Sequence, residues 1–140
     1  MLLVLSMSVW DAQVVHRYTG YTVAIGSAFN VLLGLHVKGM YDHGRMPSAP
    51  MRYTHRAIGY TVLSTSTVQT LLGTYNFVRL HRKREMWKRL LHAALGLTAT
   101  GVYVYAGYRA FSGDYDTHRD AMFIATALSG GAALVWLLPW

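Results

Sequence analysis

Long tracts without charged residues constrain the fold of this chain more than any other feature. Each tract runs roughly 20 residues, the length that a helix needs to cross about 30 Å of hydrocarbon. Charged residues make up only 14% of the chain, against about 25% in soluble domains, and they gather between the tracts. The sequence therefore predicts one all-α domain over residues 1–140. It is an integral membrane four-helix bundle, with spans at about 12–37, 52–78, 90–108 and 121–138.

The segments that flank the spans carry residues that begin or end helices. Asp11 is the predicted N-cap of the first span. Residues 38–52 hold Gly44, Pro47 and Pro50, so this segment is predicted to be a loop. Another loop, which carries several aspartates, is predicted before residue 121.

One of the loops carries most of the formal charge of +7 and sets the predicted orientation. The segment Arg79–Arg89, RLHRKREMWKR, holds six Lys or Arg residues and one Glu. The positive-inside rule places such a loop in the cytoplasm or the mitochondrial matrix. The bundle is then up-down-up-down with both termini on that inner side, in a bacterial or mitochondrial inner membrane. A short loop between two spans offers little surface to nucleic acid, so we expect no nucleic-acid partner.

A seven-residue motif opens the first three spans. It reads HRYTGYT from His16, HRAIGYT from His55 and HAALGLT from His92. A glycine follows each histidine by four residues and therefore lies on the same helix face. These glycines are Gly20, Gly59 and Gly96.

A stripe of small and polar residues continues from each histidine when the helix is read in alternating steps of four and three. Such stripes are typical of helix packing in membranes and need no cofactor. The histidines need another explanation, because an ionisable residue within a span is a candidate for function. The stripes are His16, Gly20, Val23, Ser27, Asn30, Gly34 in the first span, His55, Gly59, Val62, Ser66, Gln69, Gly73 in the second, His92, Gly96, Ala99, Tyr103, Ala106 in the third, and His118, Met122, Ala125, Ser129, Ala132 in the fourth.

The direction of each span predicts which histidines lie at the same depth. The first and third spans start on the inner side, so His16 and His92 form an inner pair. The second and fourth spans start on the outer side, so His55 and His118 form an outer pair, unless His118 belongs to the loop before the fourth span. Two histidines fill both axial positions of a haem iron, and this ligation suits electron transfer. We therefore expect one haem b at the inner pair, or two if the outer pair also forms. The glycine four residues after each histidine of the motif would let the haem macrocycle approach the helix backbone.

The remaining histidines fit these pairs less well. His36 lies twenty residues after His16, which is about 200° around the helix and on the opposite face. His43 is an outer-side alternative, and His81 in the basic loop is expected to be solvated. The chain has no cysteine, which excludes disulfides, iron–sulfur clusters and thioether-linked haem. No carboxylate lies mid-span, which disfavours a di-metal carboxylate site.

A family resemblance lies between His55 and Arg109. Its parts are HRAIGYTVLSTSTVQTLLG, the basic loop that follows, and MWKRLLHAALG. This resembles the pattern of the cytochrome b561 family, transmembrane di-haem proteins that pass electrons across a membrane. In that pattern a helix opens with His-Arg and a glycine and has a glutamine deeper in. A basic loop follows, and the histidine of the next helix comes closely after a tryptophan. The resemblance implies that His55 and His92 bind haem, and the repeated motif extends this to His16.

The chain also departs from that family. The family usually has six spans with ligands on the central four, and this chain has four predicted spans. If spans one to three correspond to the second to fourth ligand helices, His55 has no partner and only the His16–His92 haem is expected. If all four spans correspond to the ligand helices, His55 pairs with His118 and both haems are expected.

The predicted function is that of a b-type cytochrome subunit with one or two bis-histidine haems that transfers electrons across a membrane. The sequence leaves open whether the protein is an enzyme. Any activity is expected to be that of an oxidoreductase or electron-transfer component rather than of a stand-alone enzyme. The expected partners are the lipid bilayer, other membrane subunits or a second copy of the chain, and a quinol or ascorbate-like electron donor. The alternative is an accessory subunit of a respiratory or photosynthetic membrane complex that has no haem of its own.

Overall fold

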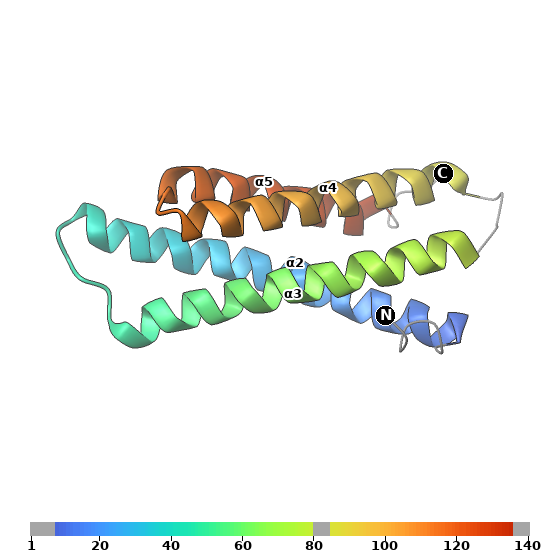
Figure 1. The fold of residues 1–140 in the computed structure, drawn as a ribbon, viewed down its shortest axis with the longest axis horizontal. Helices are drawn as coiled ribbons and strands as arrows, with labels where there is room; N and C mark the ends of the chain where they lie inside the picture. Colours follow the sequence, from blue (N-terminus) through green and yellow to red (C-terminus); the bar gives the residue numbers. More distant parts are fainter. Residues whose placement is uncertain (1–7, 80–84, 136–140) are drawn as a thin grey trace.

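The computed structural model describes residues 8–79 and 85–135, and within them the chain is entirely helical with no strand. This confirms the predicted all-α class. The helices run alternately in opposite directions along one long axis (Figure 1). They are α2 (Val9–Asp42), α3 (Ala49–Arg79), α4 (Met86–Phe111) and α5 (Tyr115–Leu134).

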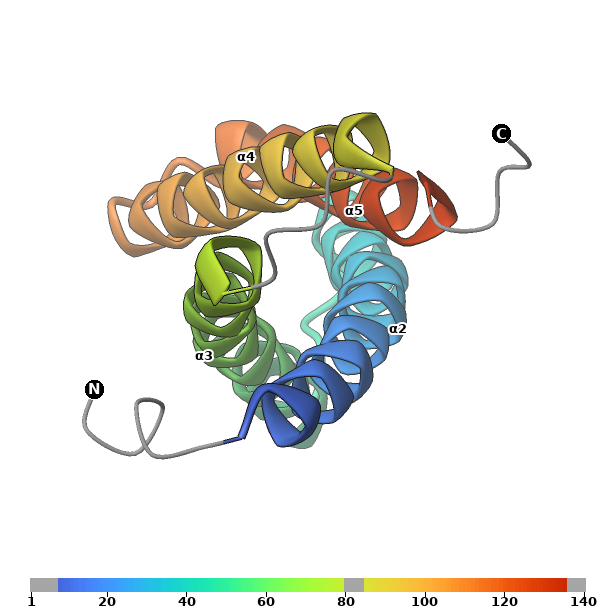
Figure 2. The ribbon, with the colours of Figure 1, turned by 90° about the vertical axis from the view of Figure 1, so that its right-hand side faces the viewer.

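The bundle consists of two antiparallel hairpins that lie one on the other. Contacts are most extensive within the pairs α2–α3 and α4–α5, and α2 also packs on α5 and α3 on α4. The order around the bundle is therefore α2, α3, α4, α5, as the end-on view shows (Figure 2). Helices α2 and α4 therefore lie diagonally opposite each other across the bundle, as do α3 and α5.

The break between the first two helices is shorter than the predicted loop 38–52. Helix α2 does not end at residue 37 but continues through Gly39 to Asp42. A single glycine costs a helix only about 1 kcal/mol, and an ion pair between Lys38 and Asp42 at 2.9 Å joins this last turn. Helix α3 begins at Ala49 and takes Pro50 into its first turn, where the missing N–H has no helical partner to lose. The loop is thus confined to residues 43–48.

The other helix ends also differ from the predicted bounds. Helix α2 is capped by Ser8, whose hydroxyl accepts a hydrogen bond from the Asp11 backbone N–H at 3.1 Å, so Asp11 is not the N-cap. Helix α4 extends beyond 90–108 at both ends. Residues 136–138 of the predicted fourth span lie outside the described residues.

Helix α5 begins at Tyr115, six residues before the predicted start at 121. The Asp114 carboxylate accepts a hydrogen bond from the Thr117 backbone N–H at 3.1 Å and one from the Thr117 hydroxyl at 2.9 Å. Arg109 at the end of α4 also pairs with Asp114. This cap places His118 in the first turn of the helix rather than in the loop.

The described part of the bundle buries several polar side chains along with its apolar core and exposes large apolar residues on its outside. Ser27 and Asn30 are 0% and 2% exposed, and Ser66 and Asn76 are also buried. On the same helix α2, Ile25 is 71% and Leu32 65% exposed. By length and composition, α2 from Asp11 to Asp42 and all of α4 are apolar enough to cross a membrane.

Candidate functional site

The inner histidine pair joins the diagonal helices α2 and α4. The Nε2 atoms of His16 and His92 lie 3.4 Å apart, and their rings are 5.7 Å apart at an angle of 83°. On the far side of each ring, Nδ1 lies at hydrogen-bond distance from a backbone carbonyl, 3.1 Å from Gln69 O for His16 and 2.8 Å from Ala132 O for His92. When Nδ1–H donates to the carbonyl, Nε2 keeps its lone pair for a metal.

The outer histidine pair joins the other diagonal, α3 with α5. The rings of His55 and His118 are 6.3 Å apart at an angle of 81°. Nδ1 of His118 is 2.9 Å from the carbonyl oxygen of Ala106, as in the inner pair. Nδ1 of His55 is buried near the backbone of Asn30 but makes no hydrogen bond of normal geometry there.

A cavity of about 870 Å³, partly open to the outside, is lined by both histidines of the inner pair. Ligand sites commonly measure about 300–1,000 Å³. All four helices contribute to its wall, and a hydrogen bond of 2.8 Å joins the hydroxyls of Thr70 and Thr100, which both line it. Many of the lining residues are small, among them Gly20, Gly73, Gly96, Ser129 and Ala132.

The three glycines of the repeated motif have different surroundings. A Cβ on Gly96 would meet no atom within 4 Å, so this residue faces open space in the cavity. A Cβ on Gly20 would lie 2.9 Å from Nε2 of Gln69, and one on Gly59 would lie 3.3 Å from Nδ2 of Asn30. Close packing against the side chain of the neighbouring helix therefore accounts for Gly20 and Gly59.

Two further glycines contact the histidines themselves. A Cβ on Gly73 would lie 3.0 Å from Cε1 of His16, and one on Gly34 would lie 2.9 Å from Cε1 of His55. Sequence reasoning placed both glycines at the ends of their stripes but gave them no role at the site. The antiparallel pairing of the first two spans could have predicted these contacts. In such a hairpin, the histidine at the start of one stripe lies beside the glycine at the end of the other stripe.

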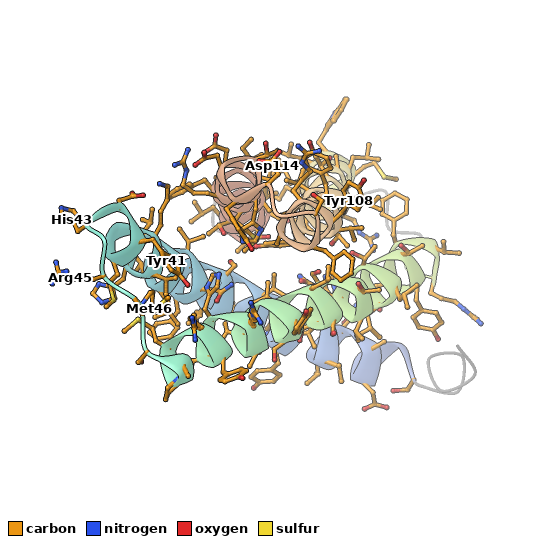
Figure 3. The ribbon with its side chains drawn as sticks, turned by 60° about the vertical axis from the view of Figure 1, so that its left-hand side comes forward. Tyr41, His43, Arg45, Met46, Tyr108 and Asp114 are labelled. Atoms are coloured by element: carbon orange, nitrogen blue, oxygen red, sulfur yellow. The ribbon has the colours of Figure 1, made fainter. Side chains whose placement is uncertain are left out.

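The other histidines lie away from both pairs. His36 and His43 are exposed and line a smaller hollow of about 370 Å³ together with Met40. Figure 3 shows His43 at the end of the bundle where the loop 43–48 lies. Nδ1 of His43 is 2.7 Å from the carbonyl oxygen of Gly39 in its own helix. His81 lies outside the described residues.

Each histidine pair offers two imidazole groups as ligands to a metal. Among residues 8–79 and 85–135, no group of three or more His, Cys, Asp or Glu side chains comes together. Comparison with family models, with curated proteins and with solved structures finds no match for this chain. The evidence for the candidate site is therefore the geometry of the two histidine pairs and of the cavity.

Proposed function

We propose that this protein is a membrane-embedded b-type cytochrome component with a haem b held between His16 and His92. One observation carries the proposal. Two imidazoles from diagonal helices direct their Nε2 atoms at each other across 3.4 Å, within a cavity of 870 Å³. The resemblance of residues 55–109 to the cytochrome b561 family agrees with this assignment.

The donor set suits a haem better than a metal held by side chains alone. A structural zinc takes four protein ligands, whereas a haem iron takes at most two from the protein. Two metal–imidazole bonds of about 2.0 Å in line need Nε2 atoms about 4 Å apart. The observed 3.4 Å is short of this by an amount that small ring movements supply.

The residues around the inner pair have defined tasks in this proposal. The carbonyls of Gln69 and Ala132 orient the two rings and raise the basicity of Nε2. Gly96 leaves open space at its own position in the cavity wall. A haem with two histidine ligands supplies reversible one-electron transfer and leaves no open position for oxygen. A quinol, an ascorbate-like reductant or a neighbouring redox subunit is the proposed electron donor.

The distribution of side chains supports a membrane location. A soluble helical bundle buries its large apolar residues, whereas this one exposes Ile25 and Leu32 and buries Ser27 and Asn30. Exposed apolar surface on this scale needs a lipid or protein environment. The proposed orientation puts the segment Arg79–Arg89 on the cytoplasmic or matrix side, in a bacterial or mitochondrial inner membrane.

A reduced-minus-oxidised visible spectrum of the purified protein tests the proposal. We expect a sharp α band of b type that disappears in both His16→Ala and His92→Ala, because each variant removes one axial ligand. His36→Ala is the matched control and should keep the band, since His36 lies outside the pair. A colourless wild-type protein would refute the cytochrome and favour the accessory subunit. A band lost in His36→Ala and kept in His16→Ala would refute the assigned ligands.

A further inference from the structure

The hairpin α2–α3 has an approximate two-fold symmetry, in which each residue of α2 corresponds to the residue of α3 that lies 39 positions later. Nδ1 of His16 lies beside the backbone of Gln69, and Nδ1 of His55 beside that of Asn30. The contacts with the glycines repeat in the same way, between Gly73 and His16, Gly34 and His55, Gly20 and Gln69, and Gly59 and Asn30.

The hairpin α4–α5 has the same symmetry with a shift of 26 positions. His92 lies beside the carbonyl of Ala132, and His118 beside that of Ala106, at nearly equal distances of 2.8 and 2.9 Å. The symmetry therefore exchanges the inner pair with the outer pair. By this symmetry, every residue that lines the cavity at the inner pair has a counterpart in the half of the bundle that contains the outer pair, here called the outer half.

The counterparts of two small residues are large. Gly96 corresponds to Met122, and Ser129 corresponds to Tyr103. Gly96 and Ser129 line the inner cavity. Met122 and Tyr103 are 8% and 3% exposed and belong to the apolar core of the bundle.

Both large residues lie near the outer pair. Met122 is one turn after His118 on α5, and Tyr103 is one turn before Ala106, whose carbonyl oxygen lies 2.9 Å from Nδ1 of His118. Tyr103 and Met122 pack in one cluster with Val62 and Ala106, and Ile58, one turn from His55, packs against that cluster. The Tyr103 hydroxyl reaches 3.2 Å from Oγ of Ser129, so the tyrosine side chain extends from the outer half to the wall of the inner cavity.

We infer that Tyr103 and Met122 close the outer histidine pair to haem, so that the chain binds one haem, at His16 and His92. This rests on the proposed function and decides the number of cofactors. His55 and His118 then act as a packed ring pair that joins α3 to α5. The inner and outer pairs are about 21–27 Å apart along the bundle. This follows from the helix rise of about 1.5 Å per residue, over 14 residues from His92 to Ala106 beside His118 and over 18 residues from His16 to Gly34 beside His55. Electrons that cross the whole membrane therefore need a second redox centre on a partner.

Haem stoichiometry of the full-length protein tests this inference. The purified protein is saturated with haemin in detergent, and haem is determined by the pyridine haemochrome method against protein by amino-acid analysis. We expect one haem per chain in the wild type and in His55→Ala, and none in His16→Ala. Two haems per chain, with one lost in His55→Ala, would overturn the inference and leave the proposed function standing. No haem in the wild type would overturn both.

A double variant adds a gain-of-function test. Tyr103→Ser with Met122→Gly gives the outer half the small residues of the inner half, and we expect it to bind a second haem that His55→Ala removes. The mirror variant, Gly96→Met with Ser129→Tyr, should bind none. Circular dichroism establishes that each variant is folded. A folded double variant that still binds only one haem would overturn the role of Tyr103 and Met122. If the double variant does not fold, the haem stoichiometry of the wild type decides whether the outer pair binds haem.

Discussion

At the scale of single residues, the position of each α2–α3 histidine depends on a glycine of the opposite helix. The ring of His16 packs on Gly73 and the ring of His55 on Gly34, where a Cβ would come within 3.0 and 2.9 Å of Cε1, respectively. The same hairpin holds Nδ1 of His16 beside the Gln69 carbonyl. The glycine and the carbonyl together set the orientation of the ring.

Gly73→Ala should disturb the inner site without removing a ligand. Its Cβ would lie 3.0 Å from Cε1 of His16, on a rigid ring that is held by a hydrogen bond. We expect a loss of about 1–3 kcal/mol in the free energy of unfolding, the usual cost of overpacking, and weaker haem retention. Thermal unfolding in detergent and the α-band intensity after gel filtration measure the two effects.

Gly101→Ala is the control for this substitution. It lies within α4, where a Cβ would meet no atom within 4 Å. It should be neutral or stabilise by about 0.5–1 kcal/mol, because alanine is the better helix former. Equal destabilisation by the two variants would contradict a specific contact between Gly73 and His16.

At the scale of helices, the two hairpins are each closely packed and are joined to one another by fewer contacts. One of these contacts is the hydrogen bond between Thr70 of α3 and Thr100 of α4, at 2.8 Å. Both residues line the inner cavity. The bond therefore fixes the spacing of two helices at the cavity wall.

A double-mutant cycle with Thr70→Val and Thr100→Val should show a coupling energy of about 0.6 kcal/mol, and at most about 1.7, the range known for hydrogen bonds between membrane helices. The free energy of unfolding in detergent provides the measurement. Thr74→Val is the matched control, because the Thr74 hydroxyl donates to the carbonyl of Thr70 in its own helix at 2.9 Å. Coupling between Thr74 and Thr100 as large as that between Thr70 and Thr100 would rule out the proposed link.

At the scale of the whole molecule, the alternating helix directions put two kinds of connection at opposite ends (Figure 1). The loop 43–48 and the turn between α4 and α5 lie at one end, where Arg45 and Asp114 are found (Figure 3). The end of α3 at Arg79 and the start of α4 at Met86 lie at the other end. In a membrane, the two ends face different compartments.

Cysteine labelling can assign those compartments, because the chain has no cysteine of its own. Arg45→Cys and Ser112→Cys are exposed at one end, and Glu85→Cys is exposed at the other. In intact bacterial spheroplasts, a membrane-impermeant maleimide should label the first two and spare the third, since positive charge favours the cytoplasm. Labelling of all three before lysis would contradict a membrane-spanning bundle, and labelling of Glu85→Cys alone would reverse the orientation.

The sequence by itself determined the all-helical class and which histidines lie at the same level along the bundle. The regular spacing of the stripe after His16 and His55 defines one face of a helix, and alternating helix direction then orders the histidines. Local propensity did not determine the helix ends, because Gly39 and Pro50 are tolerated where neighbouring residues complete the turn. Only the tertiary structure decided that Gly73 packs against His16 and that Met122 and Tyr103 lie together in one buried cluster. Those contacts join residues on different helices, and their distances depend on how closely the hairpins pack, which no local pattern of residues specifies.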